Sequence, residues 1–104
     1  MDTFKINIRK TVYDVNHESW PEEYQVYANR GREFLFFFYK SQTSDDVWYF
    51  HLSENGSREL FITSKQFPVE YILGLAKAVL TVRYGIIDLD VRLTAEAKRT
   101  LKIK

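Results

Sequence analysis

The stretch from Glu33 to Ser64 constrains the fold of this chain more than any other. Three short runs rich in aromatic and β-branched residues follow one another there, at Glu33–Lys40, Asp46–Ser53 and Arg58–Ser64. Turn-forming residues separate the runs, and Asn55-Gly56 is a preferred pair for a two-residue type I′ turn. This pattern predicts an antiparallel β-meander.

Two earlier runs also alternate between apolar and polar residues, with the period of two that is typical of strands. The first contains Phe4, Ile6 and Ile8, and the second begins at Tyr24 and ends near Asn29. Arg30-Gly31 then predicts a tight turn into the meander, because glycine takes positive φ without steric cost.

The two turns define a register if each has two residues in its loop. Tyr27 then lies opposite Phe34, Val26 opposite Leu35, and Phe50 opposite Phe61. The loop at 41–45 is longer, and across it we place Phe38 opposite Trp48.

This register divides the sheet into two faces, and both are apolar in the central strands. One face carries Tyr24, Val26, Ala28, Leu35, Phe37, Tyr39, Val47, Tyr49, Leu60 and Ile62. The other carries Tyr27, Phe34, Phe36, Phe38, Trp48, Phe50, Leu52 and Phe61. A sheet with one solvated face should alternate cleanly, so we expect something to cover each side.

One cover is a long amphipathic helix from Pro68 to Tyr84, in which apolar residues recur at helical spacing. Pro68 suits the first turn, and Gly85 suits a left-handed C-terminal stop. Ile87–Leu93 then alternates as a fifth strand. Thr94 could cap a short helix to Leu101, or the end of the chain could continue as strand.

We therefore expect a single α+β domain over residues 1–104: a four-stranded antiparallel meander, a long amphipathic helix, a fifth strand and a short C-terminal helix or strand. A length of 104 residues fits one domain. The chain has no cysteine, no run near the roughly 20 apolar residues of a membrane span, and no apolar block of a signal peptide at its start. These features favour a cytoplasmic protein.

Few residues suggest chemistry. His17 and His51 lack the helical i, i+4 partner of a zinc site, and no cysteine can complete a set. Asp88 and Asp90 point to one strand face and could bridge a cation, although a solvated face explains them as well. Glycine-rich phosphate loops and nucleophile elbows are absent. We expect no enzymatic activity, no cofactor and no metal.

The surplus of rings points instead to a binding surface. Eight Phe, seven Tyr and two Trp make up 16% of the chain, and exposed rings often anchor protein interfaces. We expect a partner protein, or a second copy of this chain, to contact an aromatic sheet face. The partner-binding candidates are Tyr27, Phe36, Trp48, Arg30 and Arg32. Small, cysteine-free, motif-poor domains of this kind include phage-encoded inhibitors and immunity-type proteins.

The alternative is binding of single-stranded nucleic acid. A balance of 15 basic and 14 acidic residues neither demands nor excludes it, so only a local basic patch beside rings could act in this way. The candidates are Lys5, Arg9, Tyr13 and Tyr27, with Arg30 and Arg32 nearby. The run Gly56–Phe67 resembles the last strand and helix start of single-strand-binding transcriptional coactivators, a class whose four strands and one helix imply the same layout.

Overall fold

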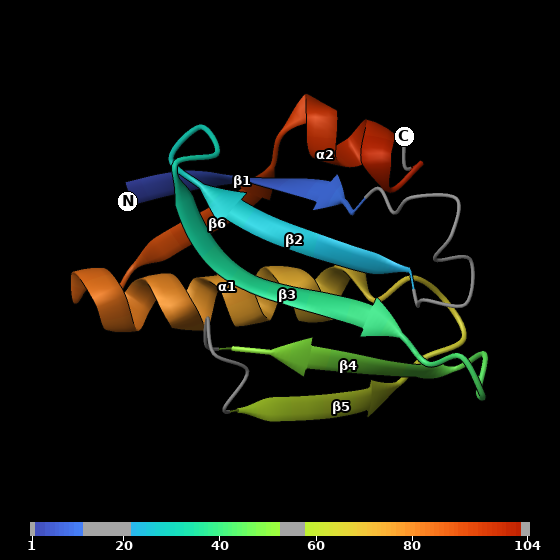
Figure 1. Ribbon diagram of the computed structural model, residues 1–104. Coiled ribbons are helices and arrows are strands. Elements are labelled where there is room, and N and C mark those ends of the chain that lie inside the picture. The colour runs from blue at the N-terminus through green and yellow to red at the C-terminus, as the bar shows by residue number, and fades with distance from the viewer. Residues whose placement is uncertain (1, 12–21, 53–57, 103–104) are drawn as a thin grey trace.

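The structure is a computed structural model that describes residues 2–11, 22–52 and 58–102. The chain forms a curled six-stranded sheet and two helices (Figure 1). The elements are β1 (Asp2–Lys10), β2 (Glu23–Ala28), β3 (Glu33–Lys40), β4 (Val47–His51), β5 (Glu59–Thr63), α1 (Val69–Tyr84), β6 (Leu89–Leu93) and α2 (Ala95–Thr100). The α+β class is confirmed. The expected strand count is wrong, because both early runs join the sheet and make six strands with the last one.

The strands lie in the order β5-β4-β3-β2-β1-β6. Strands β1 to β5 pair antiparallel with their neighbours, whereas β6 pairs parallel with β1. Figure 1 shows α1 behind the sheet at the level of β2 and β3, running back from the end of β5 to the start of β6. A parallel pair needs a crossover of this kind, so the sheet is mixed and not a meander alone.

The turn between β2 and β3 confirms the predicted two-residue loop. Arg30 and Gly31 have φ values of 58° and 82°, and the N–H of Arg32 donates to the carbonyl of Asn29 over 3.2 Å. Positive φ at both central residues is what a type I′ turn requires. The predicted pairing of Tyr27 with Phe34 follows from this turn and is confirmed.

A β-bulge then corrects the rest of this register. The pairing shifts between Val26 and Tyr27, so that Val26 lies opposite Phe36 and not opposite Leu35. Leu35 is the extra residue, and it is fully buried. Side chains alternate between the two faces of a strand. One extra residue in β3 therefore places each later side chain of β3 on the face opposite to the one that the predicted pairing with β2 gave it.

Two other predicted pairs are also wrong. Phe38 lies opposite Phe50 and not Trp48, a shift of two residues that leaves the faces of β3 and β4 unchanged. Phe50 lies opposite Leu60 and not Phe61, a shift of one that turns β5 over. The Asn55-Gly56 pair on which this register depended lies outside the described residues.

Helix α1 confirms its predicted bounds. Pro68 precedes its first residue, and Gly85 ends it at φ 67°, where its N–H donates to the carbonyl of Thr81 over 2.8 Å. Ile72, Ala76 and Leu80 are fully buried. They recur every four residues, which places them on one stripe against the sheet.

The core lies between α1 and one face of the sheet. Its buried residues are Ile6, Ile8, Tyr24, Val26, Ala28, Leu35, Phe36, Phe38, Trp48, Phe50, Ile72, Ala76, Leu80, Leu89 and Ala97. Phe67 closes the core at the start of α1, with its ring edge-on to Trp48 and Tyr24. The indole N–H of Trp48 donates to the carbonyl of Ser64 over 3.1 Å, so the buried indole has a partner.

The C-terminal segment forms the short helix α2, one of the two predicted alternatives. The hydroxyl of Thr94 accepts a hydrogen bond from the N–H of Ala97 over 3.0 Å, the geometry of an N-cap. The same hydroxyl donates to Oδ1 of the buried Asn7 over 3.2 Å. This contact joins α2 to β1, beside which the helix lies in Figure 1.

The open aromatic face of the sheet

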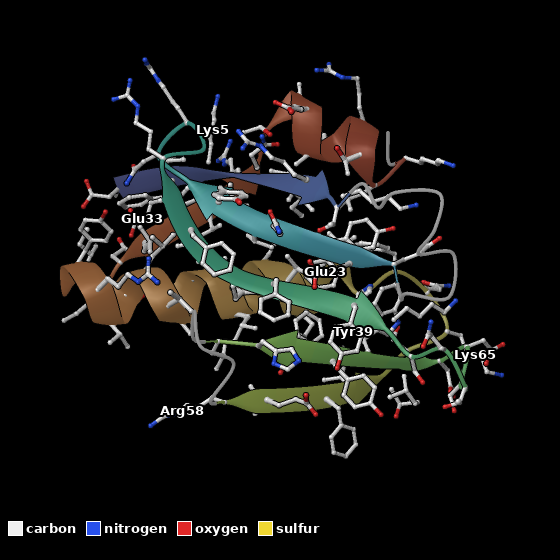
Figure 2. The ribbon with its side chains drawn as sticks, in the orientation of Figure 1. Lys5, Glu23, Glu33, Tyr39, Arg58 and Lys65 are labelled. Carbon is white, nitrogen blue, oxygen red and sulfur yellow. The ribbon has the colours of Figure 1, made fainter. Side chains whose placement is uncertain are left out.

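The side of the sheet opposite α1 is the candidate functional surface, and we call it the open face. Among residues 2–11, 22–52 and 58–102, no helix crosses it (Figures 1 and 2). Ring-bearing side chains from four strands lie on it. They are Tyr27, Phe34, Phe37, Tyr39, Tyr49, His51 and Phe61.

Five of these side chains form two rows across β3, β4 and β5, which we call the aromatic grid. In one row Phe37 lies opposite His51, and in the other Tyr39 lies opposite Tyr49, which lies opposite Phe61. The rings of Phe37 and His51 stack with centroids 4.6 Å apart and 4° between their planes. Tyr39 and Tyr49 stack at 5.4 Å. Cross-strand rings of this kind stabilise each other by about 0.5–1.5 kcal/mol per pair beyond area burial.

The grid is accessible, and its exposure increases toward the edge of the sheet. The side chains on β3 and β4 are half-buried, because neighbouring rings cover their flanks. Phe61 on β5 is 69% exposed. An edge-exposed phenylalanine continuous with half-buried tyrosines is typical of a surface that contacts another molecule.

His51 is the most polar member of the grid. Its Nε2 lies 3.0 Å from Oε2 of Glu59 and 3.4 Å from the hydroxyl of Tyr39. Its Nδ1 is buried and has no hydrogen-bond partner within the part of the chain that the structure describes. The contact with Glu59 therefore helps to fix the orientation of the imidazole, which stacks against the rings of Phe37 and Tyr39.

Two carboxylates lie beside the rings of the grid, one on β2 and one on β5. Glu59 lies opposite His51 on β5, and Glu23 lies opposite Tyr39 on β2. Burial raises the pKa of the Tyr39 hydroxyl, and the negative charges of Glu59 and Glu23 add to the rise. Figure 2 shows Tyr39 and Glu23 side by side on this face. Two carboxylates therefore lie within electrostatic reach of the Tyr39 hydroxyl.

The opposite end of the open face is basic. The guanidinium of Arg9 lies 4.8 Å above the ring of Tyr27, a cation–π arrangement. The ring of Tyr27 also meets Phe34 edge-on at 5.6 Å. Lys5 on β1 and the turn residues Arg30 and Arg32 are exposed at this end, which we call the basic end.

The structure separates the candidates predicted from sequence into three groups. Tyr27, Arg30 and Arg32, with Lys5 and Arg9, gather at the basic end. Phe36 and Trp48 are 0% and 5% exposed on the covered face, so the expectation that their rings are partly exposed is wrong. The bulge at Leu35 and the contacts of the core with α1 and Phe67 are the reason. Tyr13 lies outside the described residues.

The sequence argument missed the grid, because it chose Phe36 and Trp48 as binding candidates and not the face with Phe37, Tyr39 and Tyr49. One signal could have found it. In β2 the polar residues Glu23 and Gln25 alternate with buried ones. On β3 and β4 the rings that carry a polar atom, those of Tyr39, Tyr49 and His51, follow the same alternation. Residues paired with Glu23 and Gln25 must share their solvated face.

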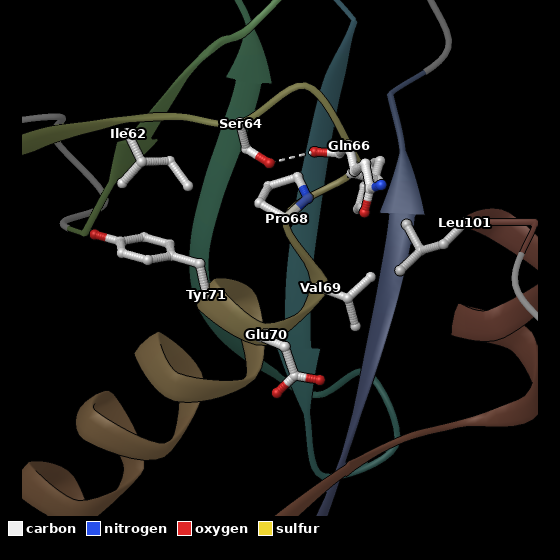
Figure 3. Close-up of a pocket in the computed structure, with 9 residues that line it drawn as sticks. Ile62, Ser64, Gln66, Pro68, Val69, Glu70, Tyr71 and Leu101 are labelled. Atoms are coloured by element: carbon white, nitrogen blue, oxygen red, sulfur yellow. Dashed lines mark hydrogen bonds between the residues drawn. The ribbon is translucent and has the colours of Figure 1, made fainter.

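A separate hollow of about 580 Å³ lies where β5 leads into α1 (Figure 3). Its lining is mainly apolar, and the hydroxyl of Ser64 donates to the carbonyl of Gln66. Glu70 is the one carboxylate in the lining, so no acid–base pair converges there. The hollow offers no chemistry comparable with the open face.

Asp88 and Asp90 are the carboxylates that could bridge a cation, and in the described part of the chain they belong to no larger cluster of possible metal ligands. Asp90 accepts a hydrogen bond from Nε of Arg92 over 2.7 Å, which already balances its charge. Within the described ranges, no group of three or more His, Asp or Glu side chains could hold a metal ion. In the same ranges, no helix is long and apolar enough to cross a membrane.

Comparison of the chain with protein-family models, with curated proteins and with solved structures finds no significant match. The function is therefore argued from the residues of the open face.

Proposed function

We propose that this protein is a non-catalytic binding domain whose aromatic grid contacts another protein. The observation that carries the proposal is the pair of carboxylates, Glu23 and Glu59, on either side of half-buried rings that continue into the exposed Phe61. Tyrosine, phenylalanine and histidine side chains offer apolar area at low cost in conformational entropy. The flanking carboxylates favour a partner segment with Lys or Arg among apolar residues.

The same carboxylates argue against nucleic acid at the grid. A single strand that stacked its bases on Tyr39 and Tyr49 would place its phosphates beside Glu23 and Glu59. Like charges at such distances oppose binding and are only partly screened at physiological salt. A protein partner meets no such repulsion and can donate hydrogen bonds to the carboxylates.

Site-specific photo-crosslinking tests the proposal. A benzophenone amino acid is introduced at position 49 in the centre of the grid, and extract of the cells that make the protein is irradiated. We expect protease-sensitive adducts of defined mass that disappear when Glu59→Lys reverses one flanking charge. The matched control carries the crosslinker at Ile87, which is 93% exposed and lies outside the grid. Equal adduct patterns at the two positions, or none at position 49, would contradict the proposal.

Single-stranded nucleic acid is a second candidate because of one specific observation, the cation–π contact between Arg9 and Tyr27 beside three further basic residues. Positive charge next to an exposed ring is the combination that binds phosphates and stacks bases. The basic end carries only two rings, Tyr27 and Phe34, and for this reason we place the candidate second.

Anisotropy of a labelled oligonucleotide at low salt tests the second candidate. Binding there should weaken steeply as salt rises and should be lost in Arg9→Ala. Lys77→Ala is the matched control, because Lys77 is an exposed cation on α1, on the other side of the sheet. A flat titration of the unaltered protein would exclude this candidate.

A further inference from the structure

The edge strand β5 carries a second surface, its free backbone edge, which shares Phe61 with the grid. It ends the strand order of the sheet, and four of its five residues are exposed. The backbone pattern shows which groups face outward. The N–H of Leu52 donates to the carbonyl of Arg58, and the N–H of Ser64 donates to the carbonyl of Asp46. In an antiparallel ladder, every second residue makes both bonds to its partner.

Residues 58, 60, 62 and 64 therefore bond to β4, and the alternate residues point the other way. The N–H and C=O groups of Glu59, Phe61 and Thr63 lie along the free edge of the sheet. An edge of this kind is a template for pairing with another strand. Apolar side chains surround it, since Leu60 and Phe61 are 40% and 69% exposed.

We propose that β5 pairs antiparallel with β5 of a second copy of this chain, with Phe61 on the two-fold axis. The three outward residues are centred on Phe61, so this register pairs Glu59 with Thr63 of the partner copy, and Thr63 with Glu59. Antiparallel registers that pair outward residues with outward residues differ by steps of two. Only this register gives each of the three outward residues an outward partner within β5 of the other copy. A shift of two residues in either direction leaves one end of β5 unpaired.

The side chains fit the same register. On the covered face Leu60 would lie opposite Ile62 of the second copy, so that two partly exposed apolar side chains on each chain gain a neighbour. On the open face the two Phe61 rings would meet, and the aromatic grids of both copies would join. Cross-strand apolar and aromatic pairs are the main stabilising contacts of a sheet.

Charge also fits a two-fold arrangement. Figure 2 shows Arg58 and Lys65 at opposite ends of β5. Antiparallel pairing brings Glu59, at one end, diagonally next to Lys65 of the other copy, two residues beyond its Thr63. The two-fold pair cannot add a third copy in the same way, because the free edge of β5 is occupied in both copies. A contact between β5 and the β6 edge of another copy would instead propagate without end.

Mass measurement by light scattering over a range of concentrations is the first test. We expect a dimer that dissociates on dilution and no larger species. A single-chain mass at every concentration, or growth beyond two chains, would overturn the proposal.

A proline on the edge tests the surface. Thr63→Pro removes an outward N–H and no hydrogen bond to β4, and edge strands tolerate proline at such positions. The dimer should weaken at least roughly tenfold, because two equivalent hydrogen bonds are lost across the two-fold axis. Leu60→Lys, which places a charge in the paired edge without changing the backbone, should do the same if the proline variant does not fold. Ile87→Ser is the matched control and should remain dimeric; dimerisation of both edge variants would overturn the proposal.

Cysteine crosslinking tests the register, and the absence of native cysteine makes the result clean. Paired residues on the axis lie within the range of Cα separations that a disulfide spans. Phe61→Cys should therefore form a covalent dimer on mild oxidation. Glu59→Cys alone should not, whereas a mixture of Glu59→Cys and Thr63→Cys chains should give a crosslinked pair. Crosslinking of Glu59→Cys to itself would overturn the register.

Discussion

At the scale of single residues, Glu33 shows how one side chain can join distant parts of the fold. Its carboxylate accepts hydrogen bonds from Tyr84, Arg83 and Asn29. Arg83 also donates to the carbonyl of Phe34 over 2.9 Å. The end of α1 is thereby held to the turn between β2 and β3, on the covered side of the sheet.

The hydrogen bonds to Glu33 predict that the free energy of unfolding decreases at acidic pH. Burial tends to raise the pKa of Glu33, but the hydrogen bonds from Tyr84 and Arg83, with the charge of Arg83, lower it below 4.5. A carboxyl whose folded pKa is depressed stabilises the fold above its unfolded pKa, and the contribution is lost as pH falls through the folded value. Urea unfolding of the unaltered protein and Glu33→Gln should therefore differ near neutral pH, and the difference should shrink as pH falls through the depressed folded pKa. A difference independent of pH would contradict this expectation.

Tyr24 predicts the opposite behaviour in alkali. Burial, followed by the charge and hydrogen bond of Glu22, raises the pKa of its hydroxyl to about 12. A group with a raised folded pKa stabilises the fold below its unfolded value of 10.0, and this contribution is lost as pH rises through the folded value. Ultraviolet titration of tyrosinate should show that Tyr24→Phe loses a late-titrating group, with a pKa of about 12, that the unaltered protein has.

Gly31 is required by the turn it occupies. Its φ is 82°, and a Cβ atom there would lie 2.5 Å from Nη2 of Arg9. Gly31→Ala should cost about 1 kcal/mol or more in the free energy of unfolding. It should also push the guanidinium away from Tyr27. Thermal unfolding measures the first effect, and oligonucleotide binding, if present, should report the second.

At the scale of elements, the short helix α2 depends on its cap. A helix of six residues is not stable alone, and Thr94 provides both its first hydrogen bond and its contact with Asn7. Thr94→Ala should lower the free energy of unfolding by about 1–2 kcal/mol. Thr94→Ser keeps the hydroxyl and should remain close to the unaltered protein; an equal loss in both variants would show that the methyl group, not the hydroxyl, matters.

The bulge in β3 decides which rings of this strand lie on each face of the sheet. The extra Leu35 moves Phe36 and Phe38 to the covered face and leaves Phe37 and Tyr39 on the open one. Without it, the polar ring tips of Tyr39, Tyr49 and His51 would lie beneath α1. The position of the aromatic grid thus depends on a single inserted residue.

At the scale of the whole molecule, the two faces of the sheet differ in what their rings do. Phe38 is fully buried, and Phe38→Ala should cost about 3–5 kcal/mol in the free energy of unfolding. Phe61 is mostly exposed, and Phe61→Ala should change the stability of the single chain by about 0.5 kcal/mol or less. Denaturant unfolding at a concentration where the chain is monomeric measures both. Equal losses would mean that the open face is covered.

The sequence by itself determined the parts of this protein that local chemistry controls. Pro68 and Gly85 bounded α1, Arg30-Gly31 predicted the tight turn between β2 and β3, and Thr94 marked one of two alternatives that became α2. The alternation of apolar residues located the strands and showed rings on both sides of the sheet. Each of these signals acts over a few residues, through backbone preferences or hydrogen bonds within reach of one side chain.

Only the tertiary structure decided which rings are buried, how the sheet closes on β6, and on which face the aromatic grid lies. A bulge at Leu35 and a one-residue shift between β4 and β5 are small in local energy, yet each exchanges the faces of a strand because side chains alternate with a period of two. The competition is settled by packing, since Phe36, Phe38, Trp48 and Phe50 fill the space beneath α1. The rings left over, with Glu23 and Glu59 beside them, make up the open face.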